Sequence, residues 1–146
     1  MKQIWIPVFF LLSLAAAAQV TNASVLGKWT SPNGSTIEIY RCGANVCARL
    51  VAISKDAPSR LDARNPNAAQ RTRSLCGLEI GTDFHLTAPG MAEGGKLYDP
   101  ESGKTYSGSM TRDGDKLKLR GYVGIALFGR TETWTSAQGN IAPCHS

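Results

Sequence analysis

Hydrophobic and polar residues alternate along the second half of this chain with the period of two that is typical of β-strands. Lys116-Leu117-Lys118-Leu119-Arg120 alternates without a break, which indicates a strand with one face toward solvent and the other toward a core. Asp113-Gly114 lies just before this segment, and Asp-Pro-Glu-Ser-Gly at 99–103 lies one strand earlier. Both have the composition of hairpin turns, so the stretch predicts consecutive antiparallel strands.

Short alternating segments bounded by turn residues recur along most of the chain. The pattern predicts strands at 25–30, 36–41, 48–53, 75–80, 96–98, 104–110, 116–122 and 130–135, with a weaker strand at 84–87 and a glycine-rich loop at 88–95. About eight antiparallel strands in sequence order can close into a barrel without exposed sheet edges. We therefore expect an all-β fold, a single antiparallel up-and-down barrel; a sandwich of similar strand count is the alternative.

Residues 55–74 interrupt the strand pattern. Pro58 breaks it first, and Asn65-Pro66-Asn67 breaks it again and could open a short helix over 67–71. A connection of this length in a compact domain is often functional or mobile. The segment is basic, so it is either a lid that attracts anions or an ordinary solvated loop, and Asp62 and Arg71 are expected to pair within it.

The first residues have the composition of a secretory signal peptide. A positive start at Lys2 is followed by an apolar run from Ile4 to Leu14 and then by alanines. The run is shorter than the roughly 20 apolar residues that span a bilayer, and no Cys follows it for lipid attachment. We expect removal of residues 1–18 by cleavage near Ala18-Gln19 and export to the periplasm or beyond. Residues 19–146 are then one domain with a C-terminal tail at 136–146.

Four cysteines in an exported domain predict two disulfides. Cys42 and Cys47 flank a four-residue hairpin loop, which places them opposite each other and within bridging distance. Cys76 and Cys144 then pair by elimination. A zinc site is the alternative, but the chain has no C-x-x-C spacing, and zinc thiolates are disfavoured in an oxidising compartment.

The charge of the chain is mildly basic and gives only weak information about partners. Without Lys2 the chain carries 15 basic and 11 acidic residues, a net charge of +4, and the basic residues never form a run of four. Such a balance favours anionic small molecules, lipid headgroups or acidic surfaces, whereas nucleic-acid binding usually requires a clustered basic patch. We expect no nucleic-acid partner and a monomeric protein.

Little in the sequence indicates catalysis or metal binding. The acidic residues at 99, 101, 113 and 115 lie where turns require them, and His85 has no second ligand at metal spacing. The chain contains no G-x-S-x-G, H-E-x-x-H or phosphate-binding glycine motif. We therefore expect no catalytic residue, no metal and no cofactor, with enzymatic activity left open.

A series of short motifs runs through the chain in a specific order. They are Gly27-Lys28-Trp29, Ile39-Tyr40-Arg41-Cys42-Gly43, Asn65-Pro66-Asn67, Tyr98-Asp99-Pro100 with Gly103-Lys104-Thr105-Tyr106, Leu119-Arg120-Gly121-Tyr122, and 128–135 (FGRTETWT). From Val25 to about Thr135 the chain thereby resembles a bacterial family of exported proteins, domain of unknown function 2147. The resemblance implies a lipocalin-like barrel and brings no established activity and no catalytic residues.

A wider similarity to lipocalins concerns the first and last strands. Lipocalins begin with G-x-W on the first strand, and an Arg late in the chain packs across that Trp at the closed end of the barrel. By this resemblance Trp29 and Arg130 are expected to form such a pair, which would combine packing with a cation–π contact.

Strand parity defines a ligand site inside the predicted barrel. The last strand places Arg130, Glu132 and Trp134 on one face. With inward residues of other strands, the predicted ligand-binding set is Trp29, Tyr106, Met110, Leu119, Arg130, Glu132 and Trp134. Buried charges must pair or meet a ligand, so an anionic group is expected at Arg130. The alternative is an Arg130–Glu132 or Arg130–Trp29 contact that only supports the barrel.

The sequence thus favours an exported barrel that binds or carries a small apolar or amphipathic molecule. The first alternative is a non-catalytic envelope interaction module with a filled barrel. Its docking face would include Glu38, Tyr40, Lys118, Arg120 and Tyr122. The second alternative is a small periplasmic enzyme at the barrel mouth. An interior cavity above roughly 300 Å³ would favour ligand binding over the filled barrel.

Overall fold

The computed structural model describes residues 24–125, 129–139, 141–142 and 144. The expected signal peptide at 1–18 and its cleavage site lie outside the described residues, as does part of the expected tail.

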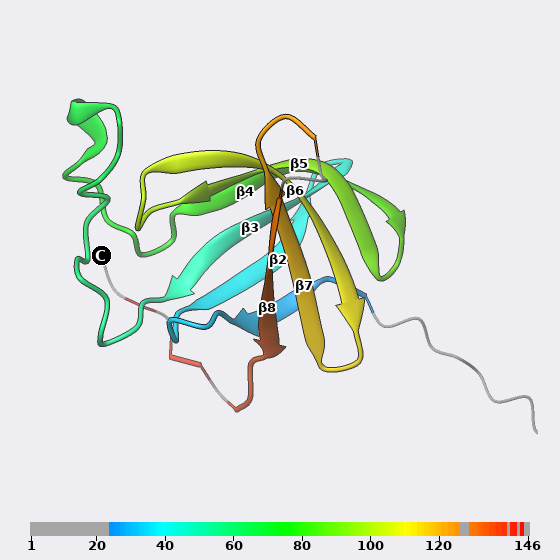
Figure 1. Cartoon of the computed structure of the whole chain (residues 1–146). Helices are drawn as coiled ribbons and strands as arrows, with labels where there is room; N and C mark the ends of the chain where they lie inside the picture. Colours follow the sequence, from blue (N-terminus) through cyan, green and yellow to red (C-terminus); the bar gives the residue numbers. More distant parts are fainter. Residues whose placement is uncertain (1–23, 126–128, 140, 143, 145–146) are drawn as a thin grey trace, which may run out of the picture.

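The described chain forms an eight-stranded antiparallel barrel, in which each strand pairs with the next along the sequence and the last pairs with the first (Figure 1). The strands are β1 (Gly27–Thr30), β2 (Thr36–Cys42), β3 (Asn45–Ala52), β4 (Glu79–Ala88), β5 (Met91–Asp99), β6 (Lys104–Asp113), β7 (Lys116–Tyr122) and β8 (Arg130–Ser136). Closure rests on two pairings between β1 and β8, Trp29 with Ser136 and Thr30 with Thr135. The up-and-down barrel expected from the sequence is confirmed.

Side chains point alternately into the barrel and out of it along the strands. On β7, Leu117 and Leu119 are buried, whereas Lys116 and Lys118 between them are exposed, as the period of two requires. Burial of each leucine side chain favours folding by roughly 1.5–3 kcal/mol. The pattern of β7 therefore fixes which of its faces points inward.

One end of the barrel, here called the Trp29 end, is filled by side chains. Trp29 is buried there and donates its indole N–H to the backbone oxygen of Val25 at 2.9 Å. The guanidinium of Arg112 lies over the Trp29 ring, 5.0 Å from its centroid, and donates to the backbone oxygen of Ser24. The N-terminal segment is also held by a hydrogen bond from Val25 N to the backbone oxygen of Pro89.

The expected pairing of Trp29 with Arg130 is therefore wrong, because Arg112 takes that place. Arg130 is the first residue of β8, and β8 runs toward the Trp29 end. The closing register sets Ser136, the last residue of β8, opposite Trp29. Arg130 consequently lies at the opposite end of the barrel, here called the mouth.

The segment 88–95, expected as a glycine-rich loop, is mostly strand. The hairpin turn is confined to Pro89 and Gly90, and β5 begins at Met91. Its glycines allow an irregularity in the strand. The register between β5 and β6 shifts between Ala92 and Gly95, and Gly94 there adopts the left-handed conformation at φ 73°. Gly95 lies flat against the fully buried ring of Phe84. Glycine is thus needed here for packing.

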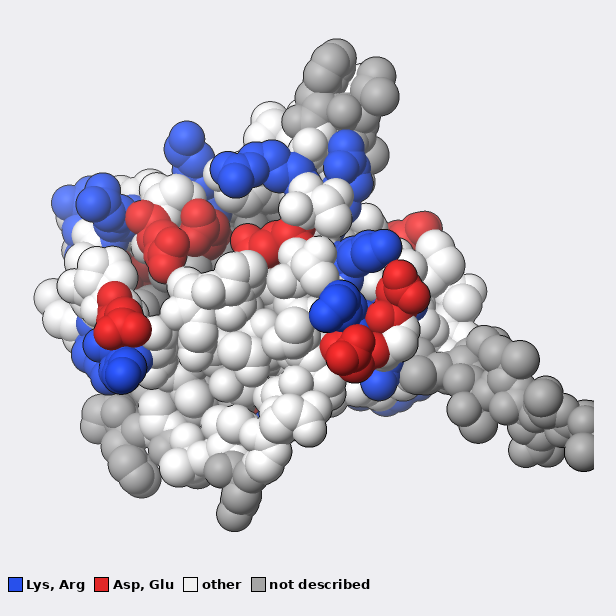
Figure 2. Space-filling view, turned by 60° about the horizontal axis from the view of Figure 1, so that its bottom comes forward, with Lys and Arg blue, Asp and Glu red and all other residues white. Residues whose placement is uncertain are grey.

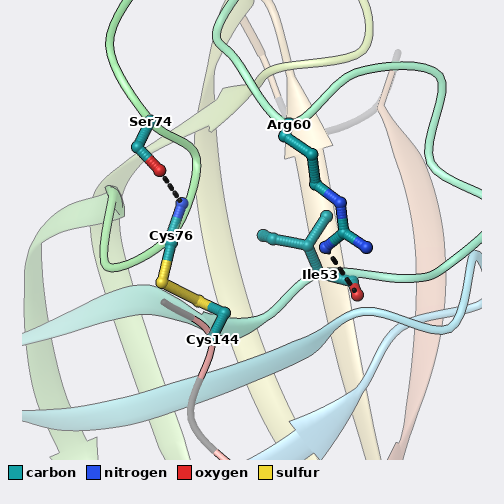
Figure 3. The surroundings of a disulfide bond; sticks show 5 residues. All are labelled: Ile53, Arg60, Ser74, Cys76 and Cys144. Atoms are coloured by element: carbon teal, nitrogen blue, oxygen red, sulfur yellow. Dashed lines mark hydrogen bonds between the residues drawn. A yellow bond between two sulfur atoms is a disulfide. The ribbon is translucent and has the colours of Figure 1, made fainter. Parts of the chain in front are cut away.

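Both disulfides of the expected pairing are present. Cys42–Cys47 bridges β2 and β3 beside their turn, which is shorter than the expected four-residue loop because Cys42 pairs with Asn45 and Cys47 with Tyr40. Cys76–Cys144 joins the segment before β4 to the C-terminal part of the chain. Around the second bridge, Ser74 Oγ accepts a hydrogen bond from the Cys76 amide, and Arg60 donates to the backbone oxygen of Ile53 (Figure 3). The second bridge thus anchors the end of the long β3–β4 connection.

Charges of both signs are interspersed on the surface. On the face shown in Figure 2, Lys and Arg side chains lie beside Asp and Glu side chains around a broad uncharged area. This face therefore has no extended patch of a single sign. Among the described residues, none of the helices has the length and apolar character needed to cross a membrane.

The packing of Gly95 on Phe84 gives a test of the fold. A Cβ at Gly95 would lie 2.4 Å from the Phe84 ring, whereas a Cβ at Gly121 would meet Tyr106 at an ordinary 3.5 Å. We expect Gly95→Ala to destabilise the protein by about 1–3 kcal/mol through overpacking and Gly121→Ala to cost less than about 1 kcal/mol. Urea unfolding of both variants measures this; equal losses would contradict the packing argument.

Candidate functional site

A cavity of about 780 Å³ opens at the mouth of the barrel. It lies where β1, β3, β5 and β7 end and where β2, β4, β6 and β8 begin. Its inner wall is apolar and is formed by Ile37, Leu50, Ile80, Leu97, Leu119 and Trp134. Tyr98, Tyr106 and Tyr122 add aromatic surface, so the cavity is apolar at its base with polar groups around it.

Five of the seven predicted site residues line this cavity, namely Tyr106, Leu119, Arg130, Glu132 and Trp134. Trp29 and Met110 do not line it, and both are buried nearer the Trp29 end. The alternation of side chains along β6 correctly predicted that Met110 faces inward. Alternation gives no information, however, on how far a residue lies from the mouth along the barrel axis. Met110 lies four residues beyond Tyr106 along β6, a distance of roughly 13 Å away from the mouth.

The charged residues of β8 line the cavity but remain in contact with solvent. Arg130 and Glu132 are both exposed, while Trp134 deeper along the strand is buried. Glu132 accepts a hydrogen bond from the indole N–H of Trp134. Within the part of the chain that the structure describes, Arg130 makes no ion pair with Glu132 and no contact with Trp29. The expected barrel-supporting contact is therefore absent from these residues.

The long connection between β3 and β4, residues 53–78, covers one side of the mouth and is here called the lid (Figure 1). It includes a single turn of 3₁₀-helix, η1 (Ala68–Gln70), whose N-cap Asn67 accepts a hydrogen bond from the Ala69 amide. A bridge between Leu61 and Ser74 holds its two arms together. Eight lid residues line the cavity, so the lid is part of the site: Ile53, Ala57, Pro58, Ser59, Leu61, Ala63, Arg64 and Leu75.

A fully buried carboxylate attaches the lid to the barrel. Asp62 has no exposed surface, and its oxygens accept hydrogen bonds from the Tyr98 hydroxyl, Arg73 Nε and Asn65 Nδ2. The last two are 2.8 Å long. Since Tyr98 belongs to β5, this cluster joins the lid to the barrel wall. The expected pairing of Asp62 with Arg71 is wrong, because Arg71 Nε donates to the backbone oxygen of Asn65 instead.

Burial, followed by the hydrogen bond to Asp62, raises the pKa of Tyr98 to about 12. Both causes favour the neutral phenol, which is the form that donates to the carboxylate. The Arg73 guanidinium acts in the opposite direction, because a positive charge favours phenolate. Tyr98 is therefore a hydrogen-bond donor throughout the neutral pH range.

A second attachment of the lid involves Gly103 in the β5–β6 turn. Gly103 adopts a positive φ of 71°, and a Cβ there would lie 2.0 Å from the backbone oxygen of Arg64. The lid backbone thus approaches the turn so closely that only glycine fits. Sequence reasoning assigned Gly103 to turn chemistry, and no local pattern indicated that a distant segment packs on it.

The outer barrel face carries its own polar network. The Tyr40 hydroxyl donates to Glu79, which raises the pKa of Tyr40, and Arg49 forms an ion pair with Glu38. Glu38 and Tyr40 were expected to form part of a docking face. Their side chains instead bond to neighbouring residues on the outside of the barrel. Tyr122, expected on that face too, lines the cavity because it ends β7 at the mouth. Among the described residues, His, Cys, Asp and Glu side chains form no cluster suited to a metal ion.

The contact at Gly103 leads to a prediction about the lid. Gly114 in the β6–β7 turn also has a positive φ, 61°, but a Cβ there would meet nothing within 4 Å. We expect Gly103→Ala to increase protease cleavage within residues 55–74 at least about fivefold, because it displaces the lid as well as straining the turn. The matched Gly114→Ala strains a turn alone and should leave lid cleavage unchanged. Equal cleavage in the two variants would contradict the attachment.

The raised pKa of Tyr98 predicts a pH dependence of stability. Unfolded tyrosines ionise near pH 10, whereas Tyr98 in the fold keeps its proton to about pH 12. Its contribution is therefore fully present below pH 10 and is lost as the pH rises from about 10 to about 12. Urea unfolding between these pH values should show a smaller decline for Tyr98→Phe than for the unchanged protein. The same decline in both would refute the assignment.

Comparison with known proteins places this geometry in a family. A solved structure described as "Protein HP1028 from the human pathogen Helicobacter pylori belongs to the lipocalin family" is similar at a TM-score of 0.72 and 22% identity. The match covers 80% of this chain and 84% of that one, and it shows a shared fold. No curated protein matches the chain. The family described as "Uncharacterized protein conserved in bacteria (DUF2147)" matches residues 27–136. The chain therefore belongs to this bacterial family, DUF2147, and has a lipocalin-like barrel.

Proposed function

We propose that the barrel binds one small apolar or amphipathic molecule in the cavity at its mouth. The observation that carries this proposal is the cavity itself, which has a volume of about 780 Å³, an apolar inner wall and an open side. Ligand sites of proteins commonly have volumes of about 300–1,000 Å³ with mostly apolar linings and a few polar groups. The structural neighbour's description as a lipocalin is consistent with this use of the fold.

The ligand's polar end is anionic and meets Arg130. This guanidinium lines the cavity close to its entrance and has no hydrogen bond or ion pair with other described residues. An anion there would gain a charge-assisted hydrogen bond without breaking an existing one. The apolar body would lie against Leu119, Tyr106 and Trp134.

The cavity argues against the two alternatives from the sequence. A purely structural barrel would have its interior filled by side chains, as at the Trp29 end, whereas the mouth half is open. For an enzyme, the most suggestive acid is Asp62, but three donors already occupy its oxygens and it does not line the cavity. Ligand binding is thus the function that the geometry supports best.

The site is proposed to operate outside the cytoplasm, in the periplasm. Residues 1–18 have the composition of a signal peptide, and two disulfides are typical of an oxidising compartment. The family is described as bacterial. The exported form would begin near Gln19 and act as a monomeric carrier.

Filling the cavity tests the proposal. Gly121 lines the cavity and lies in an ordinary strand conformation, so a larger side chain there occupies the cavity with little strain in the wall. We expect dodecanoate to bind the unchanged protein with one site by calorimetry and Gly121→Leu to weaken binding at least about tenfold, while Gly121→Ala binds nearly normally. Absence of binding by the unchanged protein to dodecanoate and dodecanol would refute the proposal.

A charge test separates the role of Arg130 from that of the apolar wall. Arg130→Gln should weaken binding of dodecanoate about fivefold and leave dodecanol unchanged, because only the acid presents a charge to the guanidinium. Arg41 is also exposed and lies at the Trp29 end, so Arg41→Gln is the matched control and should affect neither ligand. Equal losses for acid and alcohol in Arg130→Gln would remove Arg130 from the ionic contact.

A further inference from the structure

Large exposed hydrophobic side chains gather at the mouth of the barrel. Among the described residues there are four of them, Leu61, Met91, Val123 and Ile125. Leu61 lies on the lid, and Val123 and Ile125 follow β7 in the connection to β8, so three of the four lie at the mouth. Val123 is 73% exposed and Ile125 58% exposed. Single exposed apolar residues are ordinary, but a group beside a cavity entrance indicates an interaction surface.

Acidic and basic side chains at the mouth differ in whether they have hydrogen-bond partners. The carboxylates of Asp99, Glu101 and Glu132 accept hydrogen bonds from Ser102, Asn33 and Trp134 respectively. The guanidinium groups of Arg64 and Arg130 also line the cavity, yet within the described part of the chain they have no hydrogen-bond or ion-pair partner. The three donors are neutral, so the carboxylates keep their charge, and the entrance carries charges of both signs. The two guanidinium groups differ in that their N–H donors are available to a phosphate.

These two features together fit the chemistry of a membrane surface. Exposed apolar side chains partition into the boundary between headgroups and acyl chains, and arginine forms bidentate hydrogen bonds with phosphate. Each basic group near an anionic leaflet contributes attraction that depends on salt. A protein partner would instead require a continuous complementary surface, whereas Leu61 and Val123 here line the wall of an opening.

We infer that the mouth docks on a bilayer containing anionic phospholipid. Val123 and Ile125 enter the lipid, and Arg64 and Arg130 contact lipid phosphates. This inference rests on the proposed function in one respect: docking sets the entrance of the ligand cavity against the layer that holds amphipathic molecules. The bilayer would then be the source or the destination of the ligand.

Flotation with vesicles of equal parts phosphatidylcholine and phosphatidylglycerol tests the docking, using the exported form purified from a bacterial envelope. We expect the protein to float with these vesicles at low salt and much less with pure phosphatidylcholine. The pair Val123→Ser and Ile125→Ser should reduce binding at least about tenfold. Met91 is exposed at the Trp29 end, so Met91→Ser is the matched control and should bind within about twofold of the unchanged protein.

A charge variant and a cavity variant complete the experiment. Arg64→Gln should reduce binding to the anionic vesicles about fivefold, whereas Arg41→Gln at the Trp29 end should not. Gly121→Leu fills the cavity but leaves the rim intact and should still float, which separates docking from ligand binding. Absence of flotation with anionic vesicles, or equal losses in the rim and control variants, would overturn the docking while leaving the cavity proposal standing.

Discussion

The structure depends on the closure of its sheet through the short pairing of β1 with β8. Trp29 pairs with Ser136 and Thr30 with Thr135, and the Ala137 amide donates to the backbone oxygen of Lys28 beside them. Once this pairing is made, no strand edge remains exposed and every strand has a definite inner face. The same register places the start of β8 at the mouth and its end at the Trp29 end. The positions of Arg130, Glu132 and Trp134 relative to the cavity all follow from it.

The two ends of the barrel are built from different side chains, and this difference creates the site. At the Trp29 end the bulky Trp29, Phe84 and Met110 fill the interior, and Arg112 covers the indole. At the mouth, Gly121 occupies an inward position and opens space between Tyr106 and Leu119. The lid encloses part of this space, held by the buried carboxylate of Asp62 and by the close contact at Gly103. Stability is thus concentrated at one end and binding surface at the other.

Local patterns in the sequence predicted much of this architecture. The alternation in β7 identified its inward face, and the spacing of Cys42 and Cys47 identified a bridged hairpin. Long-range relations were less accessible. The alternation of side chains along β6 could not show that Met110 lies too deep for the cavity, and the lipocalin resemblance assigned Arg130 to Trp29 where the structure has Arg112. That choice depends on barrel closure, which brings together residues far apart in sequence.

The lid shows a second limit of sequence reasoning. Its composition predicted an irregular basic segment with a short helical turn, which the structure contains as η1. Asp62 was expected to pair locally, but its contacts include Tyr98, 36 residues away on β5. A segment without periodicity carries no signal about the surface that it covers. The glycine-rich start of β5 was misread for a related reason, since glycine serves both turns and close packing.

Native mass spectrometry of the protein isolated from its own envelope tests most directly whether the mouth cavity is a ligand site. We expect one bound apolar or amphipathic molecule per chain, released by organic extraction and absent from Gly121→Leu isolated in the same way. A chain that carries nothing, or a Gly121→Leu variant that carries the same molecule in the same amount, would contradict it.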